Sequence, residues 1–138
     1  MSTIPRGIRN NNPLNIRKGN NWQGERSIST DAQFEQFDSI VMGLRAAMKL
    51  VRNYIQGRCS DGKRYDTIRK LVSRWAPPSE NVTDKYISFV AESSGIHQDA
   101  FLYFDNEDAI CSIVRAMAFV ECGQWINEDY FHSAYRLL

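Results

Sequence analysis

One acidic residue near the C-terminus has surroundings that suit proton transfer. Glu121 follows the apolar run 117–120 and lies two residues before Gly123, so we expect it in the last turn of a helix. The negative end of the helix dipole and burial both disfavour an anion, and both therefore raise a carboxyl pKa. A carboxyl that keeps its proton near neutral pH can protonate a leaving oxygen, as in glycosidic cleavage. The alternative is a solvated Glu121, or one paired with Arg115 or Arg17.

Two other glutamates compete for this role. Glu25 lies close to Trp22 in a polar loop, and Glu35 follows Phe34 in an aromatic segment. If that segment is a strand, Glu35 points to the face opposite Phe34, and we expect it to be solvated. The remaining acids of the region are predicted to serve turns and helix caps: Asp31 and Asp38.

The segment 6–17, Arg-Gly-Ile-Arg-Asn-Asn-Asn-Pro-Leu-Asn-Ile-Arg, contains four asparagines and three arginines. An Asn side chain offers one acceptor and two donors, and Asn tolerates the left-handed backbone of tight turns. Such a loop suits a ligand made mostly of hydroxyls and amides, for example a sugar chain. The alternative is an irregular arm whose amides serve only turns and caps.

Composition excludes several classes of protein. The 138 residues are 43% hydrophobic and 24% charged with a net charge of +1, which indicates one globular domain over 1–138 and disfavours a nucleic-acid binder. No apolar run is long enough to span a bilayer, and the first residues lack the apolar core of a secretory signal. Neither the cysteines nor the histidines have metal-ligand spacing, so we predict no metal, no cofactor and no disulfide framework: Cys59, Cys111, Cys122, His97, His132.

The elements that must position these groups are mainly helical. The first 37 residues are predicted to be irregular or extended, with a short strand or hairpin arm at 33–37. Apolar spacing, caps and breakers then predict five helices: one capped by Asp38 or Ser39 and ended by Gly57, then 66–75, one from Asn81 or Thr83 to Gly95, then 107–122, and a last one from Asn127. The helix at 107–122 is apolar on nearly all sides, so we expect it in the middle of the fold.

Several motifs combine into a recognisable pattern. They are the Asn-rich segment 6–17, Trp22-Gln23-Gly24, the segment 34–37, Gly43-Leu44-Arg45-Ala46, and the run from Arg74-Trp75-Ala76-Pro77-Pro78 to Tyr86. Over residues 6–96, and more loosely over 107–135, the chain resembles the phage virion-associated muralytic proteins, which include the lytic enzyme of enveloped double-stranded RNA phages. The resemblance implies a mainly α, lysozyme-like domain similar to lytic transglycosylases, with a small extended element near the N-terminus.

The resemblance also bears on the catalytic acid. Members of this family usually carry His-Glu-Asn-Gly near the C-terminus, where this chain has Val120-Glu121-Cys122-Gly123, and they tend to have glycine where this chain has Leu14. In similar bacterial glucosaminidases and transglycosylases, the catalytic glutamate ends a helix that precedes an Asn-Asn loop. Here Glu121 comes afterwards, so we expect a rearranged connectivity. A separation above about 12 Å between the Glu121 carboxyl and loop 10–15 would contradict this expectation, because one sugar ring and its contacts could not bridge that gap.

The function implied is cleavage of the peptidoglycan glycan strand, with Glu121, Glu25 or Glu35 as catalytic acid. The implied partners are peptidoglycan and other virion proteins, and the implied location is the virion or the host cytoplasm before action on the periplasmic cell wall. Two alternatives stay open: a stem-peptide endopeptidase, and an inactive virion structural or adaptor protein. The aromatic residues among the expected substrate contacts could instead pack in the core. The expected substrate contacts are Asn11, Asn12, Asn15, Arg17, Trp22, Trp75 and Tyr86.

Overall fold

A computed structural model describes residues 4–76 and 80–138, with side chains at 80 and 81 left undescribed. The described residues form six helices: α1 (Arg6–Arg9), α2 (Ile40–Gln56), α3 (Ile68–Trp75), α4 (Glu80–Ser94), α5 (Glu107–Cys122) and α6 (Glu128–Arg136). The mainly helical prediction is therefore confirmed. The two prolines expected to end the second predicted helix, Pro77 and Pro78, lie outside the described residues.

Capping residues define several helix ends at the positions predicted from the sequence. The Ser39 side chain accepts from the Met42 N–H, and the Asn106 side chain accepts from the Ala109 N–H. Gly123 adopts a left-handed φ of 76°, and its N–H donates to the Phe119 carbonyl at 2.8 Å. A residue without a Cβ adopts this conformation at little cost, so α5 ends one residue after Glu121.

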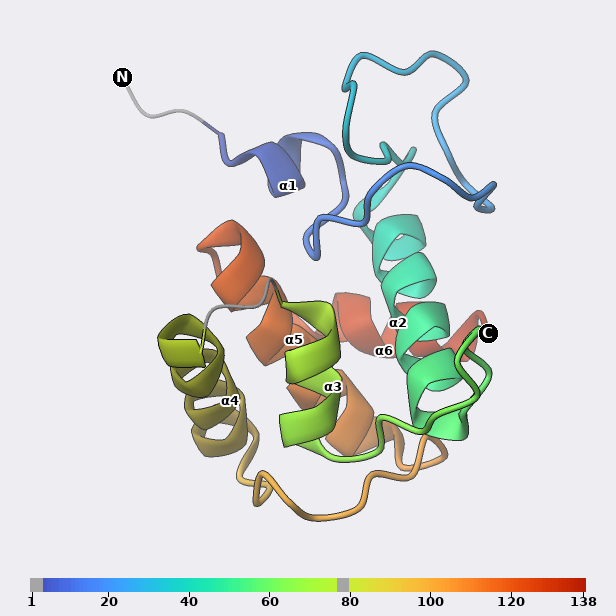
Figure 1. Cartoon of the computed structure of the whole chain (residues 1–138). Coiled ribbons are helices and arrows are strands. Elements are labelled where there is room, and N and C mark those ends of the chain that lie inside the picture. The colour runs from blue at the N-terminus through green and yellow to red at the C-terminus, as the bar shows by residue number, and fades with distance from the viewer. Residues whose placement is uncertain (1–3, 77–79) are drawn as a thin grey trace.

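Helix α5 lies in the middle of the bundle, as its apolar sequence predicted. It packs against α4, α6 and the short α1, while α2 packs against α6 and α3 (Figure 1). Four of its side chains are completely buried: Ile110, Ile113, Val114 and Met117. The C-terminal turn of α5 thereby lies near the N-terminal segment, and this packing determines where the Glu121 carboxyl stands.

The predicted strand or hairpin arm at 33–37 is present only in part among the described residues. It forms two isolated antiparallel bridges, Arg17 with Phe34 and Glu25 with Phe37, but no regular strand. The expectation for Glu35 was wrong, because this residue is 7% exposed instead of solvated. The helix α1 was also not predicted, since its four residues are too few to show an apolar period.

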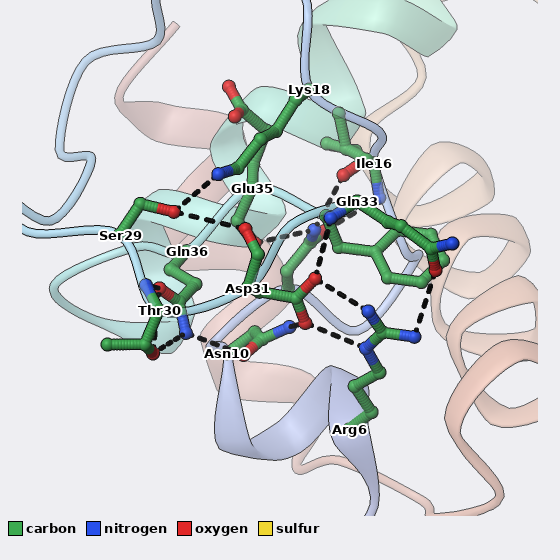
Figure 2. Close-up of polar contacts among 12 residues, drawn as sticks. Arg6, Asn10, Ile16, Lys18, Ser29, Thr30, Asp31, Gln33, Glu35 and Gln36 are labelled. Atoms are coloured by element: carbon green, nitrogen blue, oxygen red, sulfur yellow. Dashed lines mark hydrogen bonds and ion pairs between the residues drawn. The ribbon is translucent and has the colours of Figure 1, made fainter.

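Buried polar groups hold the N-terminal segment together instead of a sheet. The Asp31 carboxylate accepts hydrogen bonds from Arg6 at 2.6 and 2.7 Å, from Asn10 at 2.9 Å, and from the backbone N–H groups of Gln33 and Phe34 (Figure 2). The Arg6 guanidinium and these other donors hold the Asp31 pKa well below its usual range. Asp31 therefore serves the turn as expected, and it also binds Arg6 of α1.

The loop also docks closely on α2. A Cβ built on Gly43 would lie 1.8 Å from the Asn11 backbone oxygen, so only glycine permits this approach. Asn11 and Asn15 have left-handed φ values of 52° and 53°, which Asn tolerates better than most residues. Leu14, which replaces the family's usual glycine, is 1% exposed in the core and does not carry a positive φ.

Candidate active site

The Glu121 carboxyl lies half-buried at the C-terminal turn of α5. Desolvation raises its pKa above the ordinary value of 4.5, and hydrogen bonding to Tyr86 and Asn15 partly offsets this by favouring the ionised form. Val120 and Trp125, which are close to Glu121 in the sequence, are 39% and 49% exposed. The two neighbours that contact the Glu121 carboxyl come from distant parts of the sequence.

Tyr86 of α4 is one of those neighbours. Its ring is 5% exposed, and its hydroxyl donates to the Met117 backbone carbonyl of α5 at 3.4 Å. Burial and the adjacent Glu121 carboxylate both raise the tyrosine pKa, so the phenol stays protonated and remains a hydrogen-bond donor. Tyr86 thus contacts the Glu121 carboxyl from within the protein, and its ring is not exposed as a substrate-binding surface.

The Asn-rich loop supplies the second neighbour. Asn15 Nδ2 donates to the Glu121 backbone carbonyl at 3.2 Å, joining residues that are 106 positions apart in the sequence. The same amide lies close enough to the Glu121 carboxyl to favour its ionised form. Asn15 and Glu121 are in direct contact, so their separation stays below the limit of about 12 Å that one sugar ring could bridge.

Asn15 also borders a surface groove with a volume of about 290 Å³, which we call the Asn15 groove. Its walls come from the N-terminal loop, from α2 and from the end of α3: Asn15, Ile16, Arg17, Asn20, Leu50, Tyr54, Arg74 and Trp75. The Trp75 ring is partly buried and meets Tyr54 edge to face, with centroids 6.1 Å apart. Three of the predicted substrate contacts, Asn15, Arg17 and Trp75, therefore share one groove.

Two predicted asparagine contacts have structural roles instead. Asn12 is completely buried: its Nδ2 donates to the carbonyls of Ile16 and Glu35, and its Oδ1 accepts from the Ile16 N–H. Asn12 therefore cannot touch a ligand here, contrary to our expectation. The Asn11 side chain donates to the Phe37 carbonyl at 3.1 Å, so it too fixes the loop. Trp22 packs partly buried against the core and does not line the Asn15 groove.

The two rival glutamates lie together beside this loop. The Glu35 carboxyl interacts with that of Glu25, while its Oε2 is buried and has no hydrogen-bond partner in the described part of the chain. Desolvation first, and then the hydrogen bond and charge of Glu25, raise the Glu35 pKa to about 7, while Lys18 acts in the opposite direction. Glu25 also accepts from the Trp22 N–H at 3.0 Å.

One further cluster has ionisable groups, at the other end of α5. The potential ligand atoms of Glu107, Asp108 and His132 lie within 4.8 Å of one another. Glu107 already contacts His132 Nδ1 at 2.6 Å and Arg136 at 3.2 Å, so these two polar contacts account for the position of its carboxyl. All three cysteines are free thiols, two of them buried.

Five residues of the Asn15 groove were not predicted from the sequence: Ile16, Asn20, Leu50, Tyr54 and Arg74. Leu50 and Tyr54 are four residues apart on α2, so helical spacing could have placed them on one face. Nothing in the local sequence predicts that this face of α2 packs next to the Asn-rich loop. The Arg74 guanidinium stacks over the rings of Tyr54 and Tyr65 at 5.4 and 5.9 Å, which depends on how α3 packs.

Comparison with known proteins places the chain among bacteriophage proteins. No established family model matches it. Over 129 residues it is 37% identical to protein P5 of Pseudoalteromonas phage PM2, in an alignment that covers 89% of this chain and 74% of the relative. The chain therefore belongs to the same family as this phage protein. None of the described helices is long and apolar enough to cross a membrane.

Proposed function

We propose that the protein cleaves the glycan strand of peptidoglycan, with Glu121 as the general acid. The observation that carries this proposal is the contact between Glu121 and Asn15, because Asn15 also lines the Asn15 groove and so links the half-buried carboxyl to it. The raised pKa favours a protonated Glu121, and a general acid must carry this proton in order to transfer it to the glycosidic oxygen. The phage relative agrees with the virion setting of the family that the motifs resemble.

The proposed reaction needs only one carboxyl. Protonated Glu121 donates its proton to the leaving glycosidic oxygen as an oxocarbenium-like state develops on the sugar. The resulting carboxylate then acts as base, either toward a sugar hydroxyl that closes an anhydro ring or toward a water molecule. Asn15 would hold an N-acetyl group or steady the positive charge, and Trp75 would offer a flat apolar surface to a pyranose ring.

The same proposal includes the fold and the location. We propose that the helical domain is a lysozyme-like variant in which the acid arrives from the C-terminal side of the chain. The protein would be carried in a virion together with other virion proteins and would act on the cell wall in the periplasm. The polar Asn15 groove, bordered by two asparagines and two arginines, suits a substrate rich in hydroxyls and amides.

The test compares carboxyl variants on purified peptidoglycan. We expect Glu121→Gln to lower the rate of turbidity loss by about 10²- to 10⁴-fold, as for loss of a general acid, without lowering the melting temperature. Glu92→Gln, an exposed change on α4, serves as the matched control. Unchanged clearing by Glu121→Gln together with loss in Glu25→Gln or Glu35→Gln would transfer the role to that pair. Absence of clearing by the unmodified protein would leave the structural or adaptor role.

A further inference from the structure

A second, larger groove lies next to the Asn15 groove and has a different chemical character. It has a volume of about 720 Å³ and is formed by the segment after α2 together with α3. Five of its lining side chains are cations, and we call it the basic groove: Lys63, Arg64, Arg69, Lys70 and Arg74. The whole chain carries a net charge of only +1, so this groove is a local concentration of positive charge.

Nearby acids compensate this charge only in part. Arg69 pairs with Asp99 at 2.7 and 3.0 Å, and Lys70 pairs with Asp66, the one acid among the lining residues, at 3.6 Å. Asp61 stands near Lys63 and accepts a hydrogen bond from Tyr65. In the described ranges 4–76 and 80–138, the salt bridges leave three of the cations without an acidic partner: Lys63, Arg64 and Arg74.

Arg74 connects the two grooves, because it lines both of them. Its guanidinium is held over the rings of Tyr54 and Tyr65, so little side-chain entropy is lost when it binds an anion. The Asn15 groove leads from Arg74 to Asn15, which touches Glu121. A polymer placed with its glycan near Glu121 therefore has a route past Arg74 into the basic groove.

Peptidoglycan offers anionic groups at a suitable distance from its glycan. Each stem peptide branches from the glycan and carries free carboxylates along its length and at its end. Four or five extended residues reach roughly 15 Å, whereas Arg69 to Arg74 span only about 7.5 Å along α3. Arginine guanidinium groups match carboxylates in a two-pronged geometry, and lysines add point charges.

We propose that the basic groove binds the carboxylates of a peptidoglycan stem peptide while the attached glycan occupies the Asn15 groove. This inference rests on the proposed function and deepens it. The protein then prefers glycan strands that still carry their stem peptides over strands stripped of them. Arg74 sets the boundary between the glycan-binding and peptide-binding parts of the surface.

The activity test uses the double variant Lys63→Gln/Arg64→Gln, whose side chains are exposed and form no ion pair in the described part of the chain. We expect kcat/KM on peptide-bearing peptidoglycan to fall roughly tenfold, as for two exposed charge-assisted contacts, with no change on amidase-stripped glycan. The charge-matched control Arg9→Gln/Lys85→Gln, exposed and outside both grooves, should leave both rates unchanged. Equal losses on the two substrates, or no loss on either, would overturn the proposal.

A binding test separates this inference from the proposed function. A fluorescent stem tetrapeptide is titrated into the Glu121→Gln protein, with and without the double substitution at 63 and 64. We expect roughly tenfold weaker binding with the double substitution, and weaker binding at higher salt because exposed charges are screened. If no peptidoglycan is cleaved but this binding pattern holds, the peptide groove stands without the enzyme. Binding of a single-stranded DNA probe without binding of the tetrapeptide would refute it.

Discussion

Replacing Glu35 with glutamine tests whether the buried carboxyl of Glu35 lies against the partly buried carboxyl of Glu25. In the folded protein, burial and the adjacent Glu25 raise the Glu35 pKa from its ordinary value of 4.5 to about 7. At roughly 1.4 kcal/mol for each factor of ten in proton affinity, this corresponds to about 3 kcal/mol. Between these two pH values the folded state binds more protons than the unfolded state, so stability falls as pH rises.

The stabilising effect of the protonated Glu35 carboxyl is therefore complete below about pH 4.5 and is lost as pH rises through about 7. Glu35→Gln carries no titrating carboxyl, and its amide can donate to Glu25. The free energy of unfolding of Glu35→Gln minus that of the unmodified protein should accordingly grow by about 3 kcal/mol from pH 4 to pH 8. Taking this difference cancels every group that titrates alike in both proteins.

Urea unfolding followed by tryptophan fluorescence, at several pH values between 4 and 8.5, measures this difference. Glu25→Gln is the closest control: it removes the neighbouring charge but leaves the burial of Glu35, the larger cause, so a smaller pH dependence should remain. Glu92→Gln, exposed on α4, should show none. A difference that stays flat across this range would refute the buried pair.

Two further predictions concern how the N-terminal segment is held. Gly43→Ala should destabilise the protein by roughly 3 kcal/mol in urea unfolding, because its Cβ would lie 1.8 Å from the Asn11 carbonyl oxygen; a change below about 1 kcal/mol would show that the loop does not dock closely on α2. Asp31→Asn should lower the melting temperature at pH 7, because it removes the carboxylate that accepts from Arg6 and Asn10. Since the Asp31 pKa is lowered on folding, the difference in melting temperature between the two proteins should become smaller as pH falls below about 4. An equal difference at pH 7 and pH 3 would contradict the hydrogen bonds assigned to Asp31.

The helical part of the fold was predictable because its signals are local. Ser39, Asn106 and Gly123 are each a cap within a few residues of the helix end that they define. The predicted span 107–122 matches α5, and its apolar sequence correctly indicated a central position. Such features depend on neighbours along one helix, which a single sequence displays directly.

The N-terminal segment was less predictable because its contacts are long-range. Asp31 organises groups from Arg6 to Phe34, and nothing near Asp31 in sequence identifies Arg6 as its partner. The error at Glu35 had a different cause: the face opposite Phe34 was expected to be solvated, whereas Glu35 is 7% exposed. The buried pair with Glu25 therefore could not be anticipated from a strand pattern.

The candidate site shows the same division. Glu121 could be selected from its position near a helix end, whereas its contact with Asn15 depends on packing between α5 and a loop 106 residues away. The role expected for Asn12 was wrong because its amide donates to a buried backbone carbonyl, which needs a hydrogen-bond donor just as a ligand would. Composition alone does not distinguish these two uses of an amide.

The most direct measurement of the central claim is the mass spectrum of fragments released from purified peptidoglycan by the unmodified protein and by Glu121→Gln. The account predicts glycan-cleaved muropeptides from the unmodified protein, and at least about 100-fold less of them from Glu121→Gln at equal folded concentration. Equal release by both proteins, or release of free peptides from intact glycan strands, would contradict it.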